Sequence, residues 1–532
     1  MYSGLRDQHR WALPEVLAEQ SRTQPGRRWI EMTDGDTLTF GQAEADVSRI
    51  AGFLAGLGIK PGDMVAVFLP NSPDFVRVWV GLGRLGAVAV LLNTELTGSF
   101  LRHQLESCGA TLAVLDRTRL DGLRSVAGDL THLQRIIVVD AEVSVDSKPF
   151  EAIEWHTWKS APAYDGARPR PQDIACVMYT SGTSGPSKGV LMPHAHCYLY
   201  GLGAIDALQL TSEDRYYIVL PLFHANGLLM QLGAALIAGI PAVVRPRFSA
   251  SAWLDDVRRH RATVTNTLGA VAPFILKQPP SGADRDHDLR AIMCAPNVAE
   301  HEAAFRERFG VKDILSGFGM TEVNIPVWGR IGQSRPGAAG WVHRDHFEVV
   351  IADPETDTLV PSGQIGEILV RPKIPFGFMA GYHGLPDKTV EAWRNLWFHT
   401  GDAGVMDDTG LVTFVDRIKD CIRRRGENIS ASEVEAALIE LPGIAELAAF
   451  AVPSSVRGGE DELMLAVVPM PGASLTPQVI ADHAHKVLPR FARPRFIELV
   501  SELPKTATGK VQRAQLRRRG LSPATWDVEA SG

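Results

Sequence analysis

One stretch of the chain combines glycines, hydroxyl groups and a lysine at spacings suited to binding a polyphosphate. It runs from Tyr179 to Val190 as YTSGTSGPSKGV and follows an apolar run over 174–178 that predicts a buried strand. Backbone N–H groups left uncovered by glycine, together with hydroxyls and one ammonium, hold phosphate oxygens in many proteins. The common G-x-x-x-x-G-K-[ST] spacing is not satisfied in any frame, and a flexible Gly/Ser linker is the alternative. The candidate nucleotide-binding residues are Thr180, Ser181, Gly182, Thr183, Ser184, Gly185 and Lys188.

A second candidate segment is SGFGMTE, at 316–322, which follows a predicted strand. An aromatic ring beside glycines can stack on adenine, which indicates Phe318 and Gly317 as part of an adenine site. Thr321 can donate a hydrogen bond to a phosphate oxygen, and Glu322 supplies the hard oxygen ligand that Mg²⁺ prefers. A glycine turn with a capping glutamate is the alternative interpretation.

Three more segments carry isolated chemical groups. HTGDAG, at 399–404, presents Asp402 in a turn, and a carboxylate is the usual group that holds both ribose hydroxyls of a nucleotide. PLFHANG places His224 in an otherwise apolar stretch, where a lone histidine is more often a hydrogen-bonded core residue than a catalytic one. LPKTATGKVQR carries Lys510 on a Thr/Gly loop near the C-terminus, a position at which a lysine is normally only solvated.

Composition restricts the class of protein. The chain has 532 residues, of which 45% are hydrophobic and 22% charged, the balance of an ordinary globular protein of several domains. A formal net charge of −7 argues against a nucleic-acid binder that works through bulk charge. Five cysteines without a C-x-x-C motif indicate neither a disulfide framework nor a zinc site, and they fit a reducing cytoplasm.

Neither a signal peptide nor a membrane span is expected. The first residues, MYSGLRDQHRW, lack the apolar core of a secretory signal. The segment 216–244 contains no Asp, Glu, Lys or Arg, yet Pro221, His224, Asn226 and Pro241 interrupt it. We therefore expect a buried strand, loop, helix and strand in this segment rather than a transmembrane helix.

The predicted elements must bring these segments together. Strand-like runs alternate with helical spacing through the first two thirds of the chain, which predicts βαβ units and mostly parallel sheets in two similar α/β halves. Shorter, turn-rich strands from about 341 to 413 predict a small β subdomain. After 416, a capping-box pattern of Ser430 and Glu433 opens a helix within a smaller α+β domain. GLGRLG, at 81–86, follows a helix rather than a strand, which disfavours a dinucleotide-binding oxidoreductase.

Five motifs, in order from Tyr179 to Arg513, resemble the signatures of the adenylate-forming superfamily, which includes acyl-CoA ligases, nonribosomal adenylation domains and luciferases. The resemblance implies an acetyl-CoA synthetase-like α/β fold. An N-terminal domain, 1–418, would hold two doubly wound α/β subdomains and a small β subdomain, and 419–532 would form a mobile α+β C-terminal domain. It also implies a ligase that uses ATP and Mg²⁺ to convert a carboxylic acid into an acyl adenylate, releases pyrophosphate, and transfers the acyl group to coenzyme A.

The resemblance also implies roles for single residues. Lys510 matches the catalytic lysine of the first half-reaction, and His224 matches a residue that orients the carboxylate at the mouth of the acyl pocket. Lys419 matches the hinge about which the C-terminal domain exchanges Lys510 for a CoA-facing loop. Asp402 and Arg417 match ribose and phosphate ligands, and the residues matched to CoA binding are Arg425, Gly426 and Arg247.

The sequence indicates the chemical class of the carboxylic acid substrate. The segment 293–311 departs from the G-G-A-P pattern common in the superfamily, and with RRGENIS it looks most similar to carnitine/crotonobetaine-CoA ligases. A mixture of amides with one indole predicts a small or medium-sized acid of some polarity. The residues expected to line the acyl pocket are Asn226, Asn266, Leu268, Ala295, Gly317, Asn324 and Trp328.

Two alternative functions stay open at this point. One is an adenylate-forming enzyme whose acceptor is a carrier protein, an amine, or nitrite-type chemistry as in diazotisation. The other is a nucleotide-binding module that has lost catalysis, which the presence of Lys188, Glu322, Asp402 and Lys510 disfavours. In each case the expected protein is cytoplasmic, with small-molecule partners and no nucleic acid. A homodimer is compatible with the sequence.

Overall fold

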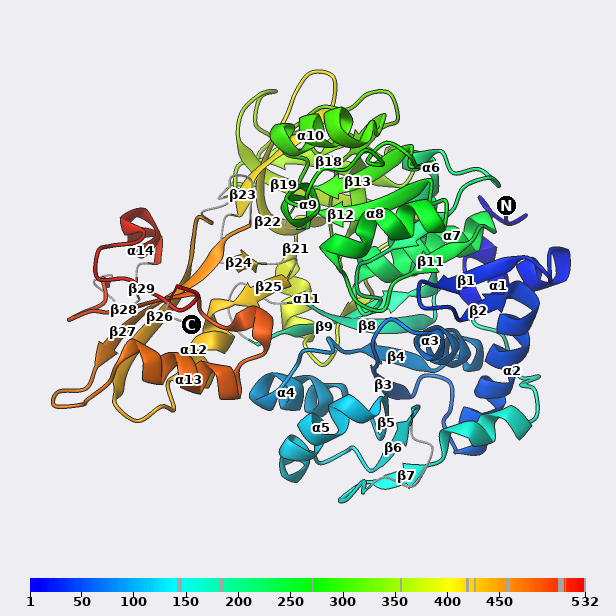
Figure 1. Cartoon of the computed structure of the whole chain (residues 1–532), viewed down its shortest axis with the longest axis horizontal. Helices are drawn as coiled ribbons and strands as arrows, with labels where there is room; N and C mark the ends of the chain where they lie inside the picture. Colours follow the sequence, from blue (N-terminus) through cyan, green and yellow to red (C-terminus); the bar gives the residue numbers. More distant parts are fainter. Residues whose placement is uncertain are drawn as a thin grey trace.

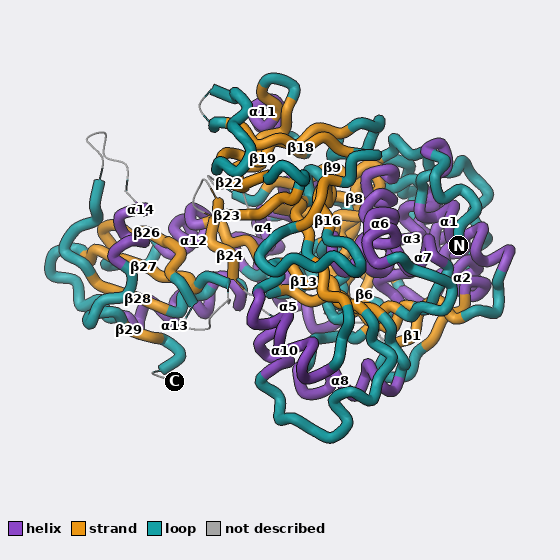
Figure 2. The backbone as a smooth tube through the Cα atoms, turned by 90° about the horizontal axis from the view of Figure 1, so that it is seen from above, coloured by secondary structure: helices purple, strands orange, loops and turns teal. Residues whose placement is uncertain are grey.

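The structure is a computed structural model of the chain. It describes residues 1–140, 146–180, 186–269, 271–354, 356–417, 421–424, 427–454, 460–505, 511 and 513–530. A large body holds most of the chain, and the C-terminal part, orange to red in Figure 1, forms a smaller lobe beside it. Figure 2, turned by 90°, shows the same separation into body and lobe.

The first sheet of the body has eight strands in the order β20-β9-β8-β4-β3-β5-β6-β7 and is parallel at its centre. Helices cover both faces, because alternate residues of β3 (Met64–Phe68) enter different hydrophobic clusters. Val65 and Val67 pack with α3 (Pro73–Leu85), whereas Ala66 and Phe68 pack with α4 (Gly98–Cys108). The other strands are β4 (Val88–Leu91), β5 (Leu112–Leu115), β6 (Arg135–Val138), β7 (Glu151–Ile153), β8 (Ile174–Thr180), β9 (Lys188–Pro193) and β20 (Gly381–Tyr382).

Local sequence signals set the ends of the helices on this sheet. Thr39 and Gln42 form a capping box at the start of α2 (Phe40–Gly56). The Ser72 hydroxyl accepts a hydrogen bond from the backbone of the first turn of α3, and this helix ends at Gly86 with φ of +81°. The glycines of GLGRLG therefore lie in and at the end of a helix, which confirms that they do not form a dinucleotide-binding loop.

The second sheet has seven strands in the order β14-β13-β12-β10-β11-β1-β2. Strand β1 pairs in parallel with β11, so the first forty residues complete the sheet of the second third. The two predicted α/β halves are confirmed, and β1 and β2, although they come first in the chain, belong to the second of the two sheets. The strands are β1 (Arg28–Met32), β2 (Thr37–Thr39), β10 (Tyr216–Ile218), β11 (Ala242–Val244), β12 (Val264–Leu268), β13 (Ala291–Ala295) and β14 (Asp313–Leu315).

Helices pack on this sheet as well. One hydrophobic cluster joins it to α8 (Ala250–Arg259), α9 (Ala272–Leu276) and α10 (Ala299–Phe309). The uncharged segment forms β10, a π-helix over Asn226–Gly233, α7 (Ala234–Ala238) and β11, which confirms the expected strand, loop, helix and strand. In the part of the chain that the structure describes, no helix is long and apolar enough to cross a bilayer.

The third sheet is antiparallel and forms the small β subdomain. Its order is β15-β16-β17-β23-β22-β19-β18, and β21 pairs with β22. It begins earlier than the predicted boundary near 341, because the segment 316–322 starts the β15–β16 hairpin. The strands are β15 (Gly317–Met320), β16 (Asn324–Trp328), β17 (Gly340–Val342), β18 (Phe347–Ala352), β19 (Gly366–Pro372), β21 (Trp393–Arg394), β22 (Trp397–Met406) and β23 (Leu411–Arg417).

In its described residues, the C-terminal lobe combines a hairpin, a four-stranded sheet and three α-helices. The sheet order is β26-β27-β28-β29, with β27 and β28 parallel. Its inner face shares a hydrophobic cluster with α4 and α5 (Leu120–Val126) of the body, so the two parts are packed together. The elements are β24 (Cys421–Arg424), β25 (Glu427–Ser430), α12 (Ala431–Leu438), β26 (Ile444–Val452), β27 (Glu462–Pro469), α13 (Pro477–Val487), β28 (Phe496–Leu499), α14 (Arg513–Arg519) and β29 (Trp526–Asp527).

Candidate active site

Four side chains from separate elements meet beside the hydroxyl-rich segment. The Thr180 hydroxyl, at the end of β8, donates a hydrogen bond to Oε1 of Glu322 at 3.0 Å. The Tyr382 hydroxyl, on β20, donates to the same oxygen at 3.0 Å. Nζ of Lys188, at the start of β9, lies 4.0 Å from the centroid of the Tyr382 ring. We call Thr180, Lys188, Glu322 and Tyr382 the phosphate-site cluster.

The electrostatics of this cluster favour an anionic ligand. Burial lowers the pKa of the Lys188 ammonium, although the Glu322 carboxylate acts in the opposite direction. Burial and the same carboxylate raise the pKa of the Tyr382 phenol, so this hydroxyl remains a hydrogen-bond donor. A buried ammonium is stabilised by added negative charge, which a polyphosphate supplies.

The turn that carries Glu322 is held by α6 (His194–Leu208), a helix that is almost entirely buried. The Tyr200 hydroxyl donates to the carbonyl of Met320 at 2.8 Å, and Nε2 of His196 lies 2.8 Å from the carbonyl of Thr321. Sequence reasoning missed His196, Tyr200 and Tyr382. Their only signal was the presence of polar groups among apolar residues and glycines.

Asn324 was expected to line the acyl pocket, and that role stays a prediction. The side chain is buried, and its amide donates to the backbone carbonyl of His196 at 2.9 Å. Its backbone has a φ of +69°, a left-handed conformation that asparagine tolerates better than most residues. Asn324 therefore closes the tight turn after Glu322 and fixes it to α6.

The ribose and adenine candidates lie on the third sheet. Asp402 on β22 pairs with Arg417 on β23, so the register makes these two positions cross-strand neighbours. Asp402 is only 2% exposed, and its backbone N–H donates to the Thr400 hydroxyl at 3.1 Å. The Phe318 ring stacks on Phe414 with centroids 6.2 Å apart, so a stacked adenine would need the opposite face of Phe318. The Arg417 side chain lies outside the described residues.

The donor set fits a magnesium ion bound together with a nucleotide. Glu322 contributes carboxylate oxygens, and within the described ranges no group of three or more His, Cys, Asp or Glu side chains could form a metal cage. Mg²⁺ is usually held by one or two carboxylates, with substrate phosphates and water completing its shell. Glu322 would thus be the protein ligand of a metal that arrives with ATP.

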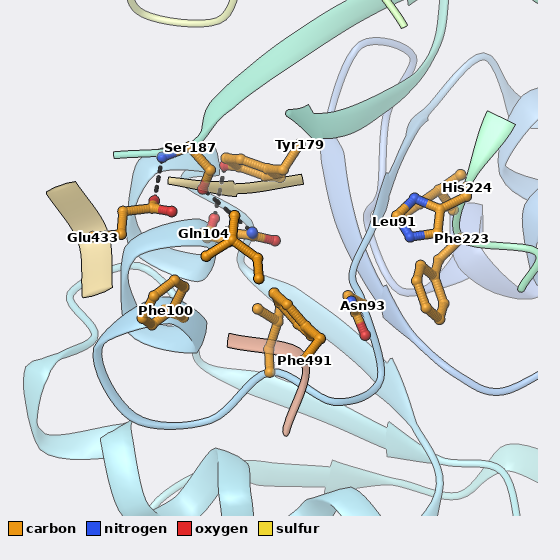
Figure 3. Close-up of a pocket in the computed structure, with 12 residues that line it drawn as sticks. Leu91, Asn93, Phe100, Gln104, Tyr179, Ser187, Phe223, His224, Glu433 and Phe491 are labelled. Carbon is orange, nitrogen blue, oxygen red and sulfur yellow. Dashed lines mark hydrogen bonds between the residues drawn. The ribbon is translucent and has the colours of Figure 1, made fainter. Parts of the chain in front are cut away.

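A cavity between the body and the C-terminal lobe leads towards His224 (Figure 3). About 530 Å³ of space within it is free of atoms, part of it open to solvent. Glu433 lies at one end with Ser187, and His224 lies at the other beside Phe223, whose ring centroid is 4.6 Å away. The remaining lining residues are Leu91, Asn93, Leu96, Phe100, Gln104, Tyr179, Ile429 and Phe491.

Two of the acyl-pocket candidates, Asn226 and Asn266, meet in a chain of hydrogen-bonded amides. The Tyr216 hydroxyl donates to Oδ1 of Asn266 at 2.7 Å, and Nδ2 of Asn266 donates to Oδ1 of Asn226 at 2.7 Å. Nε2 of Gln231 donates to the same Asn226 oxygen at 3.2 Å. With the residues that the structure describes, the amide N–H groups of Asn226 make no hydrogen bond, and its side chain is half-buried. Asn226 can therefore offer two donors to a ligand.

Other candidates lie apart or outside the described residues. Ala295 pairs with Leu268 across β12 and β13, and Trp328 is buried opposite Gly317. The Arg247 side chain is 81% exposed and lies 3.8 Å from Glu95. Outside the described residues lie Ser181, Gly182, Thr183, Ser184, Gly185, Lys419, Arg425, Gly426 and Lys510.

Comparison with known protein families shows which family this chain belongs to. Residues 17–383 match the family model described as AMP-binding enzyme, and residues 433–510 match that of the AMP-binding enzyme C-terminal domain. The chain belongs to the AMP-binding enzyme family. It is an AMP-forming acyl-CoA synthetase that uses ATP and coenzyme A, as its motifs predicted.

Individual relatives of this AMP-binding enzyme agree with that assignment. The human long-chain fatty acid transport protein 1 is 30% identical over 96% of the chain and 83% of the relative. The crotonobetaine/carnitine–CoA ligase of Shigella dysenteriae is 30% identical over 89% of the chain and 91% of the relative.

A solved structure adds a comparison of shape. The o-succinylbenzoate CoA synthetase MenE of Bacillus subtilis, as a double mutant bound with its product analogue OSB-NCoA, has a TM-score of 0.81 at 25% identity. That comparison covers 96% of this chain and 99% of MenE. The same enzyme in complex with AMP gives 0.65, over 96% of this chain and 98% of that structure. The arrangement of the AMP-binding enzyme described here is thus more similar to the complex with the product analogue.

Proposed function

We propose that this acyl-CoA synthetase activates a small or medium-sized carboxylic acid that carries a hydrogen-bond acceptor away from its carboxylate. The observation that carries the proposal is the amide chain of Tyr216, Asn266, Gln231 and Asn226. Two donors converge on the Asn226 oxygen, which directs the amide N–H groups away from the chain. A site of this kind discriminates strongly against an acid without the acceptor, because the donors are then desolvated without a partner.

ATP would bind at the phosphate-site cluster, with Ser181, Gly182, Thr183, Ser184 and Gly185 as further donors. Asp402 and Arg417 would hold the ribose, and Gly317 and Phe318 the adenine, while Thr321 would donate to a phosphate oxygen. Mg²⁺, when bound at Glu322, would offset negative charge on the phosphate oxygens. These roles rest on the motif matches and on the geometry of Thr180, Lys188, Glu322 and Tyr382.

The chemistry explains why cations and donors gather there. A carboxylate is a poor electrophile, because it is anionic and resonance-stabilised. Its attack on the α-phosphorus of ATP breaks the bond to pyrophosphate and gives an acyl adenylate whose AMP is a good leaving group. The transition state carries negative charge on the phosphate oxygens, so preorganised donors such as Lys188 and Lys510 lower its free energy.

The second half-reaction would use the cavity between body and lobe. The thiol of CoA attacks the acyl carbonyl and forms a thioester, AMP leaves with the electrons of the broken acyl–oxygen bond, and the thiol proton passes to solvent. His224 would orient the acyl group at the inner end of the cavity. Arg425 and Gly426 would face the CoA arm, with Arg247 as a more distant candidate, and Lys419 would be the hinge of a C-terminal domain spanning 419–532. The enzyme would act in the cytoplasm.

A pyrophosphate-release screen over acids, with and without CoA and followed by mass analysis of the products, tests the proposal. Each acid would be paired with an analogue of equal size that lacks the polar group. We expect release to favour the polar member, and acyl-CoA to form only when CoA is added. The Glu322→Gln variant controls for release that does not come from this site.

The screen also distinguishes the alternatives. A preference for apolar acids of equal size would contradict the proposed substrate class. Adenylate formation without any thioester product would instead indicate an amine, carrier-protein or nitrite-type acceptor.

A further inference from the structure

A hydrogen bond joins the C-terminal lobe to the residue that precedes Lys188 of the phosphate-site cluster. Glu433, in the first turn of α12, accepts a hydrogen bond from the backbone N–H of Ser187, the residue before Lys188 (Figure 3). The sequence predicted Glu433 only as half of a capping box with Ser430, whose side chain lies outside the described residues. The tertiary structure extends the Glu433 carboxylate across the boundary between the two parts of the molecule.

Ser187 is fixed firmly from the body side. Nε2 of His103 lies 2.8 Å from its carbonyl oxygen, and Nε2 of Gln104 donates to its hydroxyl at 3.3 Å. Both residues belong to α4, and Ser187 is only 8% exposed. Its backbone N–H therefore has a set position, and it needs an acceptor because an unpaired buried N–H is costly.

A nucleotide phosphate is the other acceptor suited to this N–H. Ser187 adjoins Lys188 in the chain, and Lys188 belongs to the phosphate-site cluster with Thr180, Glu322 and Tyr382. A carboxylate and a phosphate oxygen both accept a backbone N–H at such a loop. The two acceptors cannot use one N–H equally at the same time.

We propose that Glu433 is a positioning residue that occupies the Ser187 N–H only when no phosphate group does, so that pyrophosphate departure permits the C-terminal lobe to dock as seen here. The inference rests on the proposed function, because it requires that ATP phosphates bind beside Lys188. Under this proposal the lobe docks only after pyrophosphate has left, so the CoA-dependent half-reaction comes after pyrophosphate release. Bound pyrophosphate and the docked lobe then weaken each other by the same factor.

Residues around this bond pack the lobe against the body. Ile429 and Phe491 from the lobe line the cavity together with Leu96 and Phe100 from the body. A Cβ added at Gly98 on α4 would lie 3.2 Å from the carbonyl oxygen of Val487 at the end of α13. The MenE complex with a product analogue also resembles this arrangement more than the MenE complex with AMP does.

The test measures binding of magnesium pyrophosphate to the full-length enzyme by titration calorimetry. The Glu433→Ala variant removes the competing acceptor, so we expect it to bind pyrophosphate about three- to ten-fold more tightly than the wild type. Glu433→Gln keeps an oxygen that can accept the N–H and should bind close to the wild-type value. Glu440→Ala, an exposed glutamate just beyond α12, is the matched control and should leave binding unchanged.

A kinetic measurement separates positioning from general damage to the lobe. With isolated acyl adenylate and CoA, Glu433→Ala should form thioester about three- to ten-fold more slowly, while its first-turnover pyrophosphate release stays at the wild-type rate. Equal pyrophosphate affinity in the wild type and Glu433→Ala would overturn the inference and leave the proposed function intact. A wild-type enzyme that binds no pyrophosphate would overturn both.

Discussion

The Tyr382 hydroxyl donates a hydrogen bond to Oε1 of Glu322 at 3.0 Å, while the ring that carries it faces the Lys188 ammonium. One side chain thus stabilises the anion and the cation of the phosphate site. It reaches both because β20 pairs with β9, which begins at Lys188. We therefore expect that substitution of Tyr382 lowers the rate of the first half-reaction without unfolding the protein.

Tyr382→Phe should slow pyrophosphate release while leaving the fold intact. A hydrogen bond to a charged group contributes about 1.5–3 kcal/mol, so we expect a loss of about ten-fold or more in the first half-reaction. Tyr217→Phe is a matched control. Tyr217, on β10 of the second sheet, is also a buried tyrosine whose hydroxyl donates to a carboxylate, that of Asp256 on α8, at 2.8 Å. Similar activity losses in both variants, measured beside their Tm values, would show that Tyr382 acts only on stability.

Lys510→Ala should abolish adenylation yet still convert supplied acyl adenylate and CoA into thioester. The reason is that negative charge develops on phosphate oxygens only in the first step, and removal of one preorganised donor typically costs about 10²–10³ in rate. Quenched-flow assays of each half-reaction would measure the difference. Equal loss of both half-reactions would contradict this division of labour.

Docking of the C-terminal lobe should weaken as the pH rises through neutrality. Burial raises the pKa of the Glu433 carboxyl from 4.5 to about 7, while the hydrogen bonds from Ser187 act in the opposite direction. Tyr179 and His224 line the same cavity, and His103 contacts Ser187 from α4. Because the docked pKa is the raised one, the stabilisation is complete below about pH 4.5 and is lost as the pH rises through about 7.

The variant Glu433→Gln isolates that titration. Its amide cannot ionise, so the ratio of wild-type to variant rates in the CoA-dependent half-reaction should fall between about pH 4.5 and pH 7 and stay level above pH 7. Taking the ratio removes the ionisation of the CoA thiol, which both proteins share. A ratio that stays constant across this range would exclude Glu433 as the titrating group.

Asn226→Asp should change acid selectivity more than stability. The new carboxylate still accepts from Asn266 and Gln231, but it presents an acceptor where the amide presented donors. We expect kcat/KM for the preferred polar acid to fall about 10²-fold or more, since the site then repels the group it bound. The analogue without the polar group serves as the control and should lose much less. Parallel losses for both acids would argue against a direct contact with Asn226.

The amino-acid sequence alone determined the family, the alternating α/β architecture and the order of the motifs. Strand and helix patterns are local, so 174–178, 64–69 and the helix before GLGRLG could be predicted from hydrophobic spacing and glycine position. The pairing of β1 with β11 could not be predicted in this way, because the local sequence of a strand does not determine which other strand it pairs with.

Only the tertiary structure decided which residues share a site. The sequence predicted Thr180, Lys188 and Glu322, but it gave no sign that Tyr382 would join them or that Asn324 would close a turn against α6. The sequence also predicted Glu433 as a helix-capping residue, whereas in the structure its carboxylate accepts a hydrogen bond from the backbone N–H of Ser187. A side chain's type limits the bonds it can form, but long-range packing chooses the partner, and that choice depends on contacts between residues hundreds of positions apart.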